Sequence, residues 1–457
     1  MVKLLAPYKS DIRASFLLAY PVMLSQLGHV MMGVADNVMV GHLGAKELAA
    51  AGLANVAFNM LLLFGIGVSY AITPLVAAAD GEKNHLQVTE TLRHGLVINV
   101  ATSLVLCLIV YVGKNILYYI NQPPEVVALS IPYLEIVTFS LIPVLIFQTF
   151  RQFSEGLSNT WVPMVIVLSC NVLNIVLNYV LIYGYWGFPA LGLNGAGWAT
   201  FCSRVAMAVG IAAFIYYYPR FKQYRAGFRL GNYSKKLFSK MLHLGIPAGV
   251  QFIFEVAAFD FSLVMMGWLG TQALAAHQIA INLATISYMT TSGLAAAATI
   301  RVSQALGKHD FPALRRSAYV LLGMALALMT AWGILFVVGN TFLPGLYISD
   351  PEVLRIAGPI VIIAGLFQLS DGMQVVCIGA LRGLHDVKVP SVLIFIAYWV
   401  IALPLGYLFA FPLRWGAIGI WSGLLLGLTM TALAMLARFR HLSRKLAAPA
   451  KAEVTGS

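Results

Sequence analysis

The chain is poor in charge and in cysteine. Only 10% of its 457 residues are charged, 17 of them Asp or Glu, whereas about 25% is typical of a soluble domain. The four cysteines, Cys107, Cys170, Cys202 and Cys377, all fall in apolar stretches, so we expect buried thiols rather than disulfides or metal ligands. This composition argues against a water-soluble domain and against a disulfide-stabilised one.

The sequence also lacks the motifs of ATP-driven pumps and of common enzymes. It has no Walker A loop, so we expect no transport powered directly by ATP. No His and Cys spacing suits a metal centre, and no acidic cluster suits a Mg-dependent lipid-phosphate enzyme. We therefore expect a protein that is not an enzyme and that uses no cofactor.

Long hydrophobic runs fill the chain instead. Hydrophobic residues make up 60% of it, and each run of about 18 or more can cross the hydrocarbon layer of a membrane as a helix. The first run is too long for a cleavable signal, so we expect the first helix to be retained. We predict an all-α polytopic membrane protein with twelve transmembrane helices, near residues 14–40, 50–78, 91–113, 127–150, 160–183, 196–218, 243–266, 274–300, 316–340, 353–379, 389–410 and 416–437.

The basic residues predict the orientation of the chain in the membrane. The formal net charge is +12, with 29 Lys and Arg. If both termini are cytoplasmic, the cytoplasmic segments hold all of these except Lys46, Lys114, Arg204, Arg355 and Arg414. This bias follows the positive-inside rule, so the charge indicates topology, and we expect no nucleic-acid partner.

The two halves of the chain are related. Residues 21–83 align with 247–309 without a gap, and 17 of the 63 positions are identical, against about five or six expected by chance in so biased a composition. The identities include Pro21 with Pro247, and the similarity continues further along with a shift of one residue. Each repeat holds six helices.

An even number of helices per repeat keeps the two copies in the same orientation. We therefore expect two pseudo-symmetric six-helix bundles in a parallel repeat, related by an axis along the membrane normal. The expected parts are an N-terminal six-helix lobe at 1–218, a cytoplasmic basic linker at 219–242, a C-terminal six-helix lobe at 243–438 and a disordered cytoplasmic tail at 439–457.

Polar residues form a stripe along the first expected span. His29 and Asp36 share one helix face by their spacing, and Asn174 and Asn178 form a similar stripe in the fifth span. An ionisable group at membrane depth is costly, so Asp36 marks a functional site, and an Asp among amides can take up and release a proton. Alternatively, the asparagines only hold helices together and His29 is a neutral packed side chain.

Two acids, Glu255 and Asp371, fall inside the seventh and tenth spans. The eighth span adds Gln278, Asn282 and Tyr288. Two carboxylates with carbonyl and hydroxyl oxygens suit a hard cation such as Na⁺. Alternatively, they form a proton site whose acids attract a cationic substrate, or a structural network without an ion.

The acids are not duplicated along with the repeat. His29 aligns with Glu255, and Ser262 aligns with Asp36. Symmetry of the fold therefore does not explain the acids, which favours a functional role. Asp260 lies five residues after Glu255 and points about 140° away from it on a helix, so its role stays open.

The chain resembles the multidrug and toxic compound extrusion (MATE) antiporters, most nearly their NorM-like branch. The resemblance rests on the spans, the six-plus-six repeat and the stretches PVMLSQLGHVMMGVADNVMVGHLG, MMGWLGTQALAAHQIA and FQLSDGMQVVCIGALRGLHDVKVP. It covers nearly the whole chain except the tail. It implies a V-shaped pair of six-helix bundles in the bacterial inner (plasma) membrane that exports organic cations and drugs in exchange for Na⁺ or H⁺.

The resemblance also implies roles for single residues. Asp36, Asn174 and Asn178 match the N-lobe site for the coupling cation or proton. Glu255 and Asp371 match the C-lobe site for a cation, such as Na⁺, and for substrate.

Other matched positions concern the substrate path and the bending of the first helix. Pro21 matches the proline at which the first helix bends. Phe367 is a departure, because NorM-like sodium sites have a Tyr there. Gln278 and Tyr288 match positions that line the substrate path, and Asp350 matches an acid in an extracellular loop. We add Asn282 and Phe259 as substrate-binding residues because of their polar and aromatic side chains.

Other functions are considered alongside. A lipid-linked precursor flippase of the same fold superfamily needs a strongly cationic cavity, whereas the intramembrane charges here are mostly acidic, with Arg204 and Arg301 as exceptions. A membrane-embedded enzyme lacks a catalytic constellation, and a sensor or scaffold would leave the buried acids without an ion path. We expect a monomer in contact with membrane lipid and small-molecule organic cations.

Overall fold

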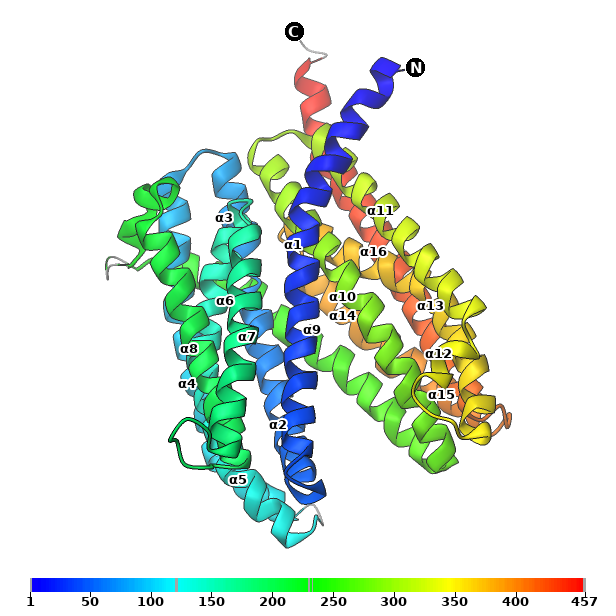
Figure 1. The fold of residues 1–457 in the computed structure, drawn as a ribbon. Coiled ribbons are helices and arrows are strands. Elements are labelled where there is room, and N and C mark those ends of the chain that lie inside the picture. Colours follow the sequence, from blue (N-terminus) through cyan, green and yellow to red (C-terminus); the bar gives the residue numbers. More distant parts are fainter. Residues whose placement is uncertain (1, 120–121, 229–230, 232, 455–457) are drawn as a thin grey trace. The chain divides into compact units, whose positions relative to one another are not determined.

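Helices account for nearly all of the computed structural model, which describes residues 2–119, 122–228, 231 and 233–454 (Figure 1); no strand occurs among these residues. Two short elements, η1 and η2, are 3₁₀-helices and η3 is a π-helix. The elements are α1 (Val2–Gly41), α2 (Ala45–Ser69), α3 (Ile72–Gly81), α4 (His85–Gly113), η1 (Lys114–Tyr119), α5 (Pro124–Phe139), α6 (Leu141–Gly156), α7 (Trp161–Tyr183), α8 (Leu193–Tyr217), η2 (Pro219–Phe228), α9 (Lys235–Leu269), α10 (Thr271–Gly307), α11 (Phe311–Val338), α12 (Phe342–Gly345), α13 (Pro351–Gly383), α14 (Lys388–Phe395), η3 (Ile396–Ala402), α15 (Leu403–Ala410) and α16 (Ala417–Val454).

The described part of the chain contains 11 helical segments that are long and apolar enough to cross a membrane. Some of them join consecutive helices, such as α2 with α3 and α5 with α6. The prediction of an all-α polytopic membrane protein is confirmed. Of the twelve expected spans, 274–300 is not among the 11. It lies in α10, a continuous helix of 37 residues that is more polar, with Gln278 and Asn282 among its exposed side chains.

The helices form two compact units. One unit, here called the N-unit, is Leu24–Gly249, and the other, the C-unit, combines Met1–Met23 with Val250–Ser457. The boundaries differ from those of the expected lobes because they fall inside helices α1 and α9. Both lie two residues after the equivalent prolines Pro21 and Pro247, so the chain changes unit at the same position of each repeat.

The N-unit includes most of the expected linker. The 3₁₀-helix η2 packs against α4 and α8, and Phe221 and Tyr224 are buried there beside Phe153. The first turns of α9 pack closely on α2, because a Cβ on Gly245 would lie 2.6 Å from the carbonyl oxygen of Val68. Residues 229–230 and 232 of the expected linker lie outside the described residues. The rest of this segment is therefore folded onto the N-unit.

The C-unit is built around α10, α11, α13 and α16, which pack on one another. The first half of α1 completes it. A Cβ on Gly293 of α10 would lie 2.5 Å from the carbonyl oxygen of Ala19, so the two backbones are in close contact. Nearer the N-terminus, the buried Asp11 carboxylate accepts from Arg301 at 2.6 Å and from Arg316 at 2.5 Å.

The repeat is visible as matching contacts in the two units. Thr73 donates its hydroxyl to the carbonyl oxygen of Gln152 at 3.1 Å, and the equivalent Thr299 donates to that of Gly379 at 2.9 Å. These pairs lie at equivalent positions of the two repeats, as do Asn84 and Asp310, whose side chains cap the next helix in each unit. The internal repeat is therefore structural as well as sequential.

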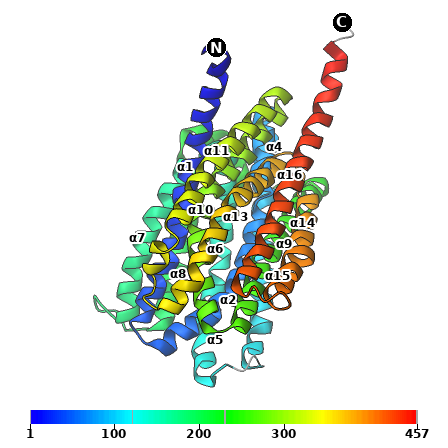
Figure 2. The same cartoon turned by 90° about the vertical axis from the view of Figure 1, so that its right-hand side faces the viewer.

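The C-terminal helix is longer than the sequence predicts. Figure 2 shows α16, in red, as one helix that leads to the C-terminus. We expect a disordered tail from residue 439, whereas the helix continues to Val454, and residues 455–457 lie outside the described part. The segment after 438 is rich in Arg, Lys, Leu and Ala, which have high helix propensity, and the buried Phe439 and Ser443 anchor its first turns.

Candidate functional site

Asp36 in the N-unit lies within a network of side chains from three helices. Asn178 of α7 donates to one carboxylate oxygen of Asp36 at 2.5 Å, and Thr200 of α8 donates to the other at 3.4 Å. Asn178 also donates to Asn174 at 3.1 Å, and both asparagines are fully buried. The structure thus brings together the three residues that we expected at this site.

The helix spacing in α1 and α7 explains this arrangement. Asn171, Asn174 and Asn178 recur every three or four residues and so share one face of α7. Asn171 donates to the backbone carbonyl of Gly28 at 2.8 Å. A Cβ at Gly28 would lie only 2.9 Å from that amide nitrogen, so the glycine allows α1 and α7 to approach closely enough for Asp36 to meet Asn178.

Two polar atoms of this site have no partner. Among the described residues, neither the amide nitrogen of Asn174 nor the amide oxygen of Asn178 has a hydrogen-bond partner, although both are buried. A buried polar group without a partner is costly. Together with the Asp36 carboxylate, these atoms provide donors and acceptors for a small polar species such as an ion or water.

Arg204 is a member of this site that the sequence did not place there. It lies one turn after Thr200 on α8 and interacts electrostatically with Asp36. Its guanidinium donates to the Ser140 hydroxyl at 2.5 Å and lies over the ring of Phe58, 4.9 Å from the centroid. In the sequence, the four-residue spacing of Thr200 and Arg204 indicates that they share a face of α8. It does not indicate that this face meets α1.

His29 lies near a second polar cluster, around Arg151, and also interacts electrostatically with Arg204 of the Asp36 site. Its Nε2 is buried and has no hydrogen-bond partner among the described residues. Gln26, one turn away, accepts from Arg151 at 3.4 Å, and Arg151 forms a buried ion pair with Glu155 at 2.7 Å. No hydrogen bond links the described atoms of His29 to Asp36, so the two side chains are related only through Arg204.

The C-unit holds the second cluster, around Glu255 and Asp371. Gln374 of α13 donates to Glu255 of α9 at 3.0 Å and lies 3.5 Å from the hydroxyl of Tyr398. Asp371, one turn before Gln374, is 5% exposed and interacts electrostatically with Glu255. Tyr398 interacts with both acids and with Tyr288. Two carboxylates from two helices thus share a buried site with an amide and phenols.

Tyr398 was not among the expected site residues. It lies in the π-helix η3, which interrupts the helix formed by α14 and α15. Such single-turn π segments occur often at functional sites. Pro404, near the start of α15, has no N–H to donate to the preceding turn, and it is the sequence signal for this irregularity. The wider turn changes the face on which Tyr398 points, so regular helix spacing does not predict it.

Aromatic rings flank this acidic cluster. Phe259 lies 5.7 Å from Tyr398 and 6.3 Å from Phe367, between ring centroids. Phe367 is 4% exposed and packs on Trp421 at 6.0 Å. Phe367, at the position where the resemblance implied a tyrosine, is therefore part of an aromatic cluster. Tyr398 supplies a hydroxyl to the same site.

The structure places other expected residues away from the acids. Gln278 donates to Asn282 at 3.4 Å along one exposed face of α10. Asp260 is exposed on α9. Asp350 accepts from the backbone of Glu352 at 2.8 Å and caps α13, which gives it a structural role.

Pro21 is buried within α1 close to the unit boundary. Its role as a bending point stays a prediction.

Among the described residues, no group of three or more His, Cys, Asp or Glu side chains is placed to hold a metal ion. A cation in the C-unit site would have two carboxylates and neutral oxygens as its ligands.

Each unit thus contains a polar site built around acids on apolar, membrane-length helices. Intramembrane acids of this kind mark ion and substrate paths, and duplicated helical bundles are typical of secondary transporters. Fold and sites together define the class as a multi-pass membrane transport protein rather than an enzyme.

Comparisons with known proteins agree. The family model described as MatE matches residues 21–180 and 247–408, so the same model matches both repeats. The chain belongs to the MatE family, and relatives named NorM make it NorM-like.

Two such relatives are full-length matches. The "Probable multidrug resistance protein NorM" of Rhizobium meliloti (strain 1021) is 36% identical over 449 residues, which cover 97% of this chain and 96% of that protein. The protein of the same name from Agrobacterium fabrum (strain C58 / ATCC 33970) is 36% identical over 436 residues and covers 94% of each chain. The structure described as "Crystal structure of MATE in the bent conformation" shares the fold, with a TM-score of 0.89 at 18% identity over 96% of this chain and 97% of that one.

Proposed function

We propose that this protein is a secondary active multidrug efflux transporter that exports organic cations in exchange for Na⁺ or H⁺. The relatives named NorM are described as probable multidrug resistance proteins, and this chain matches them over nearly its full length. We further propose that the protein is a monomer in the bacterial inner membrane. The distribution of its basic residues supports an orientation with both termini cytoplasmic.

The observation that carries the proposal is the Glu255–Asp371 pair. Gln374 brings the two acids together, because it donates to Glu255 at 3.0 Å and lies one turn after the buried Asp371, and both acids lie on membrane-length helices. Two negative charges held close together in a medium of low dielectric constant repel strongly, and a bound cation or a proton relieves the repulsion. The pair therefore favours the binding of positive charge, which either an organic cation or the coupling ion supplies.

The aromatic residues around the pair suit a lipophilic organic cation. The face of an aromatic ring attracts a cation, most strongly where water is excluded. Phe259 and Tyr398 lie side by side at the acidic site, and Tyr288 is close to Tyr398. We assign these three rings to substrate binding, with Gln278 and Asn282 as further contacts on the exposed face of α10.

The mechanism that we propose is competition for the acids. Entry of Na⁺ or H⁺ from outside neutralises Asp36 or the Glu255–Asp371 pair and weakens the binding of substrate. A tenfold change in substrate affinity requires the ion to contribute a differential of about 1.4 kcal/mol. Pro21 is the proposed bending point of α1 as the transporter alternates between states open to either side.

The N-unit site is the second proposed place for the coupling ion, beside the Glu255–Asp371 pair. Asp36 supplies one carboxylate, while Asn174 and Asn178 supply amide groups, two atoms of which lack partners. An acid among neutral amides suits a proton, and the same oxygens suit Na⁺. In the C-unit, the Tyr398 hydroxyl is the candidate to replace the hydroxyl that Phe367 lacks.

The test is export of ethidium from liposomes that contain the pure protein. A Na⁺ gradient and a pH gradient are imposed separately, each without a membrane potential. Export driven by Na⁺ alone supports a Na⁺ site at Glu255 and Asp371. Export driven by pH alone moves the coupling role to Asp36 and its asparagines. Absence of export under both gradients contradicts the proposal.

The lipid-linked precursor flippase is not favoured. Such a protein needs free positive charge for a pyrophosphate, whereas Arg151 is paired with Glu155 and Arg301 with Asp11. Arg204 donates to Ser140 and interacts with Asp36. These intramembrane arginines are already held by their own partners.

A further inference from the structure

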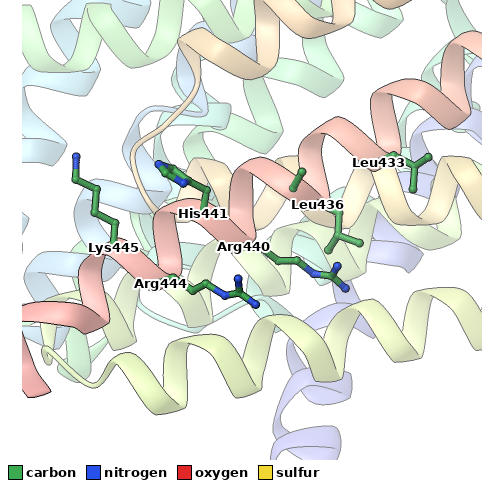
Figure 3. A pocket seen from close by; sticks show the side chains of 7 residues that line it. Leu433, Leu436, Arg440, His441, Arg444 and Lys445 are labelled. Atoms are coloured by element: carbon green, nitrogen blue, oxygen red, sulfur yellow. The ribbon is translucent and has the colours of Figure 1, made fainter.

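A cleft lies along α16, apart from both acidic sites. It is an open surface hollow of about 610 Å³ that is lined by residues of α16 alone, whose side chains Figure 3 shows. Leucine side chains line one end of the cleft and basic side chains line the other. The residues that matter here are Leu433 and Leu436 at the apolar end and Arg440, His441, Arg444 and Lys445 at the basic end.

Helix spacing produces this polarity. Arg440 and Arg444 are four residues apart and form one row on α16, whereas His441 and Lys445 form a second row about 100° around the helix, on the other side of the ribbon in Figure 3. Leu433 lies seven residues before Arg440 and continues the first row toward the apolar part of the helix. From Leu433 to Lys445 the face extends about 18 Å at 1.5 Å per residue.

The basic side chains of the cleft are not neutralised by acids. In the described part of the chain, no acidic side chain lies within 4.0 Å of a nitrogen of Arg440, Arg444 or Lys445, and all three are exposed. Arg438 on the same turns behaves differently, because it pairs with Asp386 at 2.8 Å. Arg438 is therefore paired, whereas the positive charges of Arg440, Arg444 and Lys445 remain exposed.

The combination of features selects an amphiphile. Arginine binds phosphate oxygens with two parallel hydrogen bonds, and lysine adds a point charge. A free phosphate would use only the basic end of the cleft. Leu433 lies seven residues before Arg440 and is 56% exposed. It belongs to a helix segment that is apolar enough to lie in a membrane, so an acyl chain would cover it.

We propose that this cleft binds one anionic phospholipid. Arg440 and Arg444 hold the headgroup phosphate, Lys445 adds positive charge beside them, and one acyl chain lies along Leu433 and Leu436. Basic clusters directly beyond a transmembrane helix attract anionic lipid, and the cleft gives that attraction a defined place. The site does not depend on which ion drives transport.

The test is native mass spectrometry of the full-length protein in detergent. Phosphatidylglycerol and phosphatidylcholine with the same acyl chains are titrated separately. We expect phosphatidylglycerol to bind more tightly. We also expect the triple variant Arg440→Gln, Arg444→Gln, Lys445→Gln to weaken phosphatidylglycerol binding about tenfold or more, to the level of phosphatidylcholine.

The matched control removes three positive charges elsewhere. Lys235→Gln, Lys236→Gln and Lys240→Gln change exposed lysines at the start of α9 and should leave phosphatidylglycerol binding unchanged. Equal losses in both triple variants would mean general attraction to a basic surface, and no loss in either would mean no site here. Both results overturn the proposal.

Two further measurements keep the result decisive. If the triple variant does not fold, the single exposed change Arg444→Gln should still weaken phosphatidylglycerol binding several-fold, and an unchanged affinity contradicts the proposal. Soluble glycerol 3-phosphate should not displace the lipid. Full displacement at millimolar concentration would indicate a site for free phosphate instead.

Discussion

The two units share their backbone contacts but differ in their polar residues. Thr73 and Thr299 make the same hydrogen bond to a neighbouring helix, and each unit has its own helix cap at an equivalent position. The polar sites do not match. The N-unit site has one acid, Asp36, with amides and an arginine, whereas the C-unit site has two acids with an amide and phenols.

This difference separates what the duplication preserved from what each half acquired. Small residues and threonines at helix contacts are needed wherever two helices must approach closely, so both copies keep them. Acids inside the membrane are costly and persist only where they are used. The comparison therefore predicts that the shared contacts control stability and that the unshared acids control transport.

The largest effect is expected from the C-unit acids. Glu255→Gln or Asp371→Asn should abolish ethidium export and drug resistance, because one charge of the pair that binds cations is lost. Export in proteoliposomes and resistance in cells measure this, with membrane expression checked. Asp260→Asn is the matched control, since Asp260 is exposed on the same helix. Full activity of Glu255→Gln would remove the assignment of this site.

The next effect concerns the acid of the N-unit. Asp36→Asn should stop gradient-driven export while substrate binding, followed by ethidium fluorescence, stays within about twofold. The expected reason is that Asp36 holds the coupling ion and the C-unit holds the substrate. If instead substrate binding fails and coupling survives, the two units have the opposite roles.

A smaller effect is expected at a glycine that both units share. A Cβ on Gly156 would lie 2.8 Å from the Cβ of Val76, and one on Gly383 would lie 2.9 Å from that of Val302. Gly156→Ala and Gly383→Ala should each destabilise the fold by about 1–3 kcal/mol through overpacking, seen as a lower midpoint of thermal unfolding. Gly323→Ala is the control, because a Cβ there meets no atom within 4 Å. Markedly unequal losses would show that the repeat contacts are not equivalent.

The smallest effect is expected from the shared threonines. Thr73→Val and Thr299→Val each remove one hydrogen bond between helices, worth on average about 0.6 kcal/mol in a membrane protein. Thr73 also donates to the Gln152 side chain at 2.5 Å, so its change should cost more than that of Thr299. Thermal unfolding of the two variants side by side measures the difference, and a larger loss for Thr299→Val would reverse the expected order.

Much of the architecture can be predicted from the sequence because it depends on local patterns. Apolar runs locate the helices, and the spacing of Asp36 and the asparagines predicts their meeting because both stripes are regular. The regular spacing fails at Tyr398, where a π-helix turns the residue toward the acids. It also fails at Arg204, because spacing along one helix does not say which neighbouring helix that face meets. The boundary inside α1 likewise depends on tertiary packing.

The place where the chain changes unit has a consequence for the inheritance of the fold. Residues before Leu24 belong to the C-unit, where Asp11 accepts hydrogen bonds from two arginines and Ala19 packs on Gly293. A fragment that begins just before α9 would therefore carry the second repeat without the first part of α1, which completes the core of the C-unit. The two units thus exchange the first part of their first helices, as in an intramolecular domain swap. We expect that a half-length chain of this design would complete its core only with the first helix of a second copy.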